Sequence, residues 1–250
     1  MTYKLSILCA VGTLLVGLTI AANVAAQQVA HSSVRRPQAA AEQPYTFLVF
    51  YKQNDGATQA MASALQEALA TRADQATVKY VQVGDPAQQA LVEKYDVARA
   101  PMPLTVVLAP NGAITGMFAK QTTPERVEAA FVTPTMMFTM KSLQEGKLVL
   151  VSAHGLANSP APPAIEELQG DPEFQGRVVS VTMQVSDPQE AKFIQQMKLD
   201  PQATETRTVV IAPPGVMVGQ FKANASKEAI VTALAKAGRC CDDPNCKRKQ

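Results

Sequence analysis

Hydrophobic and polar positions alternate along this chain with two different periods. Residues 45–51 form a short, mostly apolar run, which predicts a strand buried on both faces. Residues 57–73 place an apolar residue at every fourth position, which predicts one buried face of a helix. Residues 78–83 alternate between apolar and polar side chains and therefore predict a second strand.

The alternation of predicted strands and helices continues to residue 131. Asp85-Pro86 is typical of the start of a helix, and residues 104–109 predict a third strand. Asn111-Gly112 predicts a hairpin turn into a fourth strand over residues 113–118, after which Thr123 is expected to cap a last helix. Helical crossovers lead us to expect that the first three strands run parallel and that the hairpin adds an antiparallel edge.

The chain then repeats this order. Residues 82–86, Gln-Val-Gly-Asp-Pro, return as residues 184–188, Gln-Val-Ser-Asp-Pro, and residues 105–112 are similar to residues 208–215. The second copy is expected to have strands at residues 147–151, 177–185, 207–212 and 217–221, with helices beginning near Pro163, Asp187 and Ser226. The predicted fold class is α/β, with two tandem domains that each hold a mixed central sheet flanked by helices.

The segments outside these two patterns divide the rest of the chain. Residues 1–26, with Lys4 before an apolar run and Val-Ala-Ala at the end, are predicted to be a signal peptide cleaved before Gln27, rather than a membrane anchor. Residues 27–44 are interpreted as a tether, 45–132 and 147–238 as the two domains, 133–146 as a linking helix and 239–250 as a Cys-rich basic tail. We therefore expect an exported protein, periplasmic or extracellular, whose signal segment is only transiently in the membrane.

Composition narrows the classes of partner. The formal net charge is +2, no Trp is present and aromatic residues make up 5% of the chain. A basic surface or an aromatic stacking platform for nucleic acid is therefore not expected. We found no phosphate-binding loop, paired zinc motif or serine nucleophile elbow, and we predict no cofactor.

The order of elements resembles that of the thioredoxin fold. Its closest local match is Pro103-Leu104-Thr105-Val106-Val107-Leu108 followed by Asn111-Gly112 and Gly116, which looks like the thioredoxin run of a cis-proline, a strand, a turn and a glycine. The resemblance covers roughly residues 45–131 and again 147–234. It implies a cis-proline at Pro103, with a neighbouring groove as a candidate binding site, and places the corresponding position of the second copy near Thr206.

The departures from the thioredoxin pattern concern its catalytic cysteines. Thioredoxins carry two cysteines, two residues apart, where the first strand meets the first helix, and this placement lowers the pKa of the attacking thiol. The corresponding segments, residues 52–58 and 152–159, contain no cysteine. The resemblance therefore implies two redox-inactive domains, comparable to the non-catalytic domains of protein disulfide isomerase, and we name no catalytic residue.

Three cysteines at the end of the chain are the remaining candidates for chemistry. Cys240, Cys241 and Cys246 can form a structural or intermolecular disulfide, hold a soft metal with an aspartate as fourth ligand, or carry out thiol exchange. An odd thiol would allow a disulfide-linked oligomer. These alternatives stay open at the level of sequence.

Two further groups have a structural interpretation beside a functional one. His154 falls in the loop that would carry the second active site, and we interpret it as a surface residue rather than a catalyst or ligand. Met136, Met137 and Met140 with Phe138 on the linking helix are interpreted as packing rather than as a copper site. The sequence thus predicts a redox-inactive module that binds another protein or peptide, with a tail-based oxidoreductase or metal-binding protein as the alternative.

Overall fold

The computed structural model describes residues 43–155 and 161–238. The first copy comprises β1 (Tyr45–Tyr51), α1 (Gly56–Leu69), η1 (Ala70–Arg72), β2 (Ala76–Gln82), η2 (Pro86–Gln88), α2 (Gln89–Lys94), β3 (Leu104–Leu108), β4 (Ile114–Ala119) and α3 (Pro124–Ala129). Helix α4 (Pro134–Gln144) follows. The second copy comprises β5 (Leu148–His154), α5 (Pro163–Gly170), β6 (Val178–Gln184), η3 (Pro188–Glu190), α6 (Ala191–Gln196), β7 (Arg207–Ala212), β8 (Val216–Lys222) and α7 (Lys227–Gly238).

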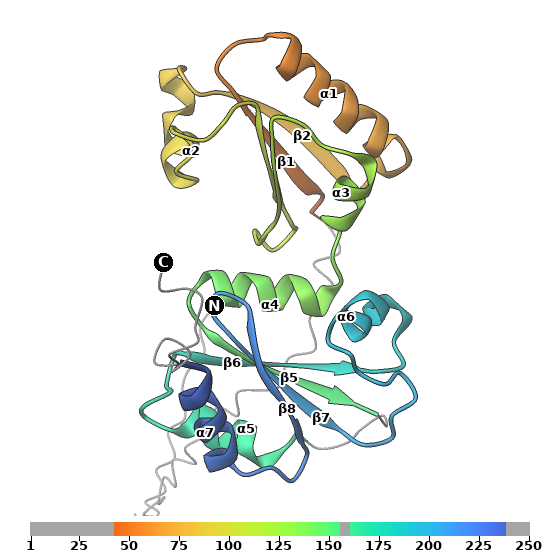
Figure 1. The fold of residues 1–250 in the computed structure, drawn as a ribbon, viewed down its shortest axis with the longest axis vertical. Helices are drawn as coiled ribbons and strands as arrows, with labels where there is room; N and C mark the ends of the chain where they lie inside the picture. Colours follow the sequence, from red (N-terminus) through yellow and green to blue (C-terminus); the bar gives the residue numbers. More distant parts are fainter. Residues whose placement is uncertain (1–42, 156–160, 239–250) are drawn as a thin grey trace, which may run out of the picture. The chain divides into compact units, whose positions relative to one another are not determined.

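The described residues form two four-stranded sheets with the same strand order. That order is β2-β1-β3-β4 in the first copy and β6-β5-β7-β8 in the second (Figure 1). In each copy the first strand pairs in parallel with the second and antiparallel with the third, and the third and fourth form an antiparallel hairpin. Even the irregularity of the two hairpins recurs, between Val107 and Leu108 and between Val210 and Ile211.

The expected direction of the third strand is wrong. β3 runs antiparallel to β1, with Leu104 opposite Phe50, and Phe50 also lies opposite Val81 near the end of β2. The connection from β2 therefore returns to the sheet at the end where it left. A crossover to a parallel third strand would have to span a seven-residue strand, which is about 23 Å long. Helix α2 has only six residues and is about 9 Å long, so it does not act as such a crossover helix. The hairpin is antiparallel, as expected.

Each sheet is covered on both faces. In the first copy, α1 and α3 cover one face of the sheet and α2 the other (Figure 1). The side chains of Phe47 and Val49 belong to the core under α1 and α3, whereas those of Leu48 and Phe50 belong to the core under α2. Alternate positions along β5 likewise divide between the side of α5 and α7 and the side of α6. The continuous apolar runs in the sequence arise because these central strands are buried on both faces.

Helix α4 contributes to two cores. Met137 and Met140 pack against the core of the first copy, and Met136 and Phe138 pack against that of the second. Thr133 caps the helix by accepting a hydrogen bond from the backbone N–H of Met136 at 3.3 Å. The methionines of this helix are packing residues in the structure.

Candidate functional site

The carboxyl end of β1 is the place where a thioredoxin would carry its cysteines. Here the loop contains Lys52, Gln53, Asn54 and Asp55, all of which are exposed. Asp55 caps α1 by accepting the backbone N–H of Thr58 at 2.9 Å. Hydrogen bonds from the backbone and side chain of Thr58 lower the pKa of the Asp55 carboxyl, which is therefore ionised at neutral pH. The loop can start a helix but offers no nucleophilic sulfur.

Pro103 lies beside this loop, immediately before β3. The Met102–Pro103 peptide bond is cis, and the Pro103 side chain is buried. The carbonyl oxygen of Pro103 accepts the backbone N–H of Lys120 at 2.7 Å. Met102 is half-buried, and within residues 43–155 and 161–238 its backbone makes no hydrogen bond. A donor and an acceptor are thus left at the end of the sheet beside residues 52–55.

The second copy corrects our interpretation of His154. It is the last residue of β5 rather than a loop residue, and only 2% of its surface is exposed. Its Nε2 lies 2.8 Å from Ser152 Oγ, and its Nδ1 lies 3.5 Å from Thr206 Oγ1. Burial lowers the pKa of His154 below its ordinary value, because the imidazolium would lose its hydration.

This polar cluster lies on the face of the sheet whose apolar residues pack against α5 and α7. Ser152 is opposite Thr182 on β6 and Thr208 on β7, and all three point to the same face of the sheet. The hydroxyls of Thr182 and Thr208 have no partner in the part of the chain that the structure describes. Residues two apart on a strand share a face, so Ser152 and His154 in a strand pattern were the signal for this pair.

The cluster is not suited to nucleophilic catalysis. Ser152 is fully buried, and no described carboxylate lies within hydrogen-bonding distance of the ring of His154. Thr206, at the position corresponding to Pro103, is also buried. A Cβ atom on Gly155 would overlap the backbone of Ala203 and Thr204. The backbone therefore closes over the end of β5, and a substrate cannot reach the serine.

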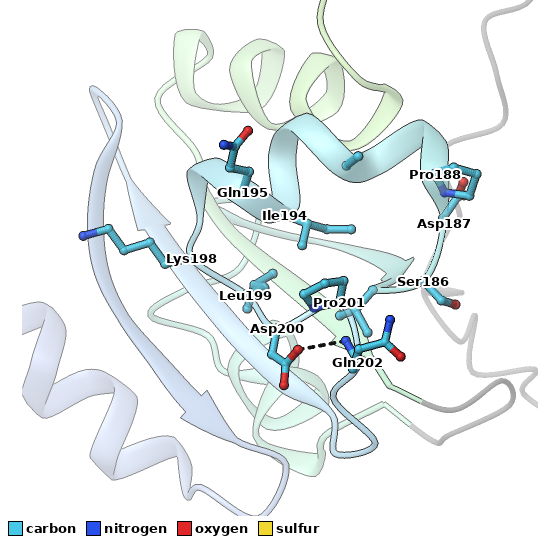
Figure 2. A pocket seen from close by; sticks show the side chains of 12 residues that line it. Ser186, Asp187, Pro188, Ile194, Gln195, Lys198, Leu199, Asp200, Pro201 and Gln202 are labelled. Carbon is cyan, nitrogen blue, oxygen red and sulfur yellow. Dashed lines mark hydrogen bonds between the residues drawn. The ribbon is translucent and has the colours of Figure 1, made fainter.

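A cavity of about 640 Å³ lies at the carboxyl end of β6 (Figure 2). Its lining includes Asp187 before η3, Ile194 on α6 and Leu199 and Asp200 in the turn after α6. Neither Pro103 nor Thr206 lines it. Ligand sites commonly occupy a few hundred Å³ outside the carboxyl ends of strands, so this cavity is a second candidate binding surface.

The structure does not describe the residues of the predicted thiol cluster. Cys240, Cys241 and Cys246 lie outside the described residues, as do the predicted signal peptide and most of the tether. Within the described ranges, no group of three or more His, Cys, Asp or Glu residues is arranged to hold a metal ion. Among the helices of the described residues, none is both long and apolar enough to cross a membrane.

Comparisons with solved structures find proteins of the thioredoxin fold. The germline-specific thioredoxin Deadhead of Drosophila melanogaster is 24% identical, with 40% of this chain and 85% of that chain covered and a TM-score of 0.29. The NTD_N/C domain of alkylhydroperoxide reductase AhpF from Enterococcus faecalis is 16% identical, with 76% and 90% covered and a TM-score of 0.30. The first two thioredoxin domains of Saccharomyces cerevisiae Eps1p are 12% identical, with 77% and 92% covered and a TM-score of 0.27.

No protein-family model matches the sequence, and the search of curated proteins found no match. The two tandem domains of this chain have a thioredoxin-like fold. This assignment is based on the strand order, the strand directions and the helices on both faces of each sheet. It concerns the fold, and the activity of the chain has to be argued from its own residues.

Proposed function

We propose that this chain is an exported, redox-inactive tandem thioredoxin-like protein that binds another protein or peptide. The observation that carries the proposal is the absence of cysteine from both β-to-α segments, residues 52–58 and 152–159. Dithiol exchange requires a thiolate held at the start of the helix. The first copy keeps the strand, the helix cap at Asp55 and the cis bond before Pro103, but it has no thiol there.

The backbone of Met102 supports binding in place of catalysis. Its N–H and C=O make no hydrogen bond among the described residues and lie at the end of the sheet. An extended peptide gains affinity when its backbone pairs with such groups, and neighbouring side chains give specificity. In the second copy Thr206 stands at the position of Pro103, and its side-chain hydroxyl lies 3.5 Å from His154 Nδ1 at this end of the sheet. We therefore assign peptide binding of this kind to the first copy.

The redox part of the proposal is tested by insulin reduction with dithiothreitol as electron donor. We expect purified protein to give no rate above background. A rate above background that disappears when Cys240, Cys241 and Cys246 are replaced by serine would overturn the proposal and favour an oxidoreductase that uses the tail. Intact-mass measurement of protein extracted from cells tests export, since cleavage before Gln27 is expected.

The binding part is tested with an unfolded polypeptide, reduced and carboxymethylated lactalbumin. Hydrogen exchange of the full chain, with and without this probe, should show protection at Met102 and at residues 52–55. The corresponding end of the second copy, residues 154–155 and 203–206, serves as the internal control because backbone contacts close it. Absence of protection at Met102 at saturating probe would contradict binding beside Pro103.

A further inference from the structure

The cavity at the carboxyl end of β6 is built from two short segments (Figure 2). The first runs from Val185 through Pro188 into α6, and the second is the turn at residues 198–202. Val185, Ile194 and Leu199 line the cavity, and at most 8% of the surface of each is exposed. These side chains also belong to the core of the second copy. The floor of the cavity is therefore apolar and held in place by the sheet.

Two carboxylates lie at the rim of this floor. Asp187 Oδ1 accepts the backbone N–H of Gln189 at 2.9 Å, and Asp200 Oδ1 accepts that of Gln202 at 2.9 Å. Neither aspartate forms a salt bridge with a residue in the described ranges. Lys198 is the cation of the lining, and Figure 2 shows its side chain directed away from Asp187 and Asp200. The rim is therefore locally negative in a chain with a net charge of +2.

The first copy has the same backbone but a different lining. The N–H of Leu199 bonds to the carbonyl of Ile194, as that of Val97 bonds to the carbonyl of Val92. The preceding residues, Lys198 and Asp96, both have positive φ, at 54° and 48°. The residue after Leu199 is Asp200, whereas the residue after Val97 is alanine. The second rim carboxylate is thus specific to the second copy, so the shared fold does not require it.

We propose that this cavity binds an extended segment of a partner protein that presents one aliphatic side chain with Lys or Arg next to it. The aliphatic side chain packs on Ile194 and Leu199, and the cation lies near Asp187 and Asp200. This inference rests on the proposed function as a protein-binding module and adds a second surface to it. Charge complementarity selects the partner, because burying a like-charged or uncharged segment would leave both carboxylates without a counterion.

The chemistry of the partner is tested with three fluorescein-labelled peptides and the full chain. The probes are Gly-Ser-Gly-Lys-Leu-Lys-Gly-Ser-Gly, the same peptide with Gly for Leu, and the same peptide with Glu for both Lys. Fluorescence anisotropy should show binding of the first peptide. Removing the Leu side chain should weaken binding more than about tenfold, and reversing the charges should abolish it. Equal binding of all three peptides would overturn the proposal.

The position of the site is tested with variants that keep the fold. Asp187→Asn and Asp200→Asn retain the side-chain oxygen that accepts the local N–H but remove the charge. Each should weaken binding of the Lys-Leu-Lys peptide about two- to fivefold, the range for an exposed ion pair. The matched control is Asp85→Asn, which changes the equivalent cap of the first copy. Equal effects of Asp85→Asn and Asp187→Asn would place the peptide elsewhere and refute the site.

A steric variant gives an independent result. Ala191 lines the cavity from α6 and is exposed, so Ala191→Trp fills the cavity without entering the core. It should abolish peptide binding, whereas Gln89→Trp at the equivalent position of the first copy should not. Unchanged binding by Ala191→Trp would overturn the inference and leave the proposed function standing, because that function is decided by insulin reduction and by protection at Met102.

Discussion

Protonation of His154 should destabilise the second copy at mildly acidic pH. Ser152 and Thr206 provide hydroxyl contacts to its ring, and no described carboxylate bonds to it. Burial lowers the pKa of His154 in the folded chain, whereas in the unfolded chain the group titrates near 6.5. As the pH falls below that value, the unfolded state binds a proton that the folded state does not. The free energy of unfolding therefore decreases with falling pH.

The size of this effect has an upper bound. If the folded ring stays neutral, one histidine with an unfolded pKa of 6.5 removes at most about 1.4 kcal/mol between pH 7.5 and 5.5. With a urea m-value of about 1–3 kcal/mol/M, the unfolding midpoint would move by about 0.5–1.4 M. A variant that lacks the imidazole separates this contribution from that of every other group.

The assay is urea unfolding followed by far-ultraviolet circular dichroism, because the chain has no Trp. Hydrogen exchange of peptides from β5 and β7 should lose protection over the same pH range, which locates the effect in the second copy. His154→Gln removes the titrating group and should flatten the pH dependence. If the wild type and His154→Gln lose the same stability between pH 7.5 and 5.5, the reasoning about His154 is refuted.

Three further changes test packing and electrostatics. Gly155→Ala should destabilise the second copy by about 1–3 kcal/mol, because the new Cβ overlaps the backbone of Ala203 and Thr204; thermal unfolding measures this, with Gly84→Ala, which has open space, as the control. Glu190→Ala leaves the N–H of Thr135 without its acceptor and should cost about 1–3 kcal/mol, whereas Glu190→Gln should cost less. Lys227 holds the pKa of Asp171 below its ordinary value through a 2.7 Å hydrogen bond, so Lys227→Met should raise that pKa in an NMR titration and Lys236→Met should not.

The candidate sites differ in how far sequence could reach them. The position of Pro103 was predicted from a short run of residues next to a hairpin turn. Such a pattern involves only residues that are neighbours in the sequence, so it can be recognised without the structure. His154 was misjudged because its burial depends on β6 and β7, which lie many residues away. The cavity between Asp187 and Asp200 was missed for a related reason. The two segments that line it come together only because α6 and the turn after it bring them side by side. No pattern of residue spacing in the sequence predicts this contact.

The amino-acid sequence alone was sufficient to identify the repeat, the order of strands and helices, and the lack of cysteine in the two segments that would carry a thioredoxin active site. Each of these depends on local periodicity or on residue identity. The antiparallel direction of β3, the burial of His154 against Ser152 and Thr206, and the cavity beside α6 became evident only in the folded chain. The direction of β3 depends on the end of the sheet to which its connection returns. The burial of His154 and the cavity depend on hydrophobic packing between segments that are distant in the sequence.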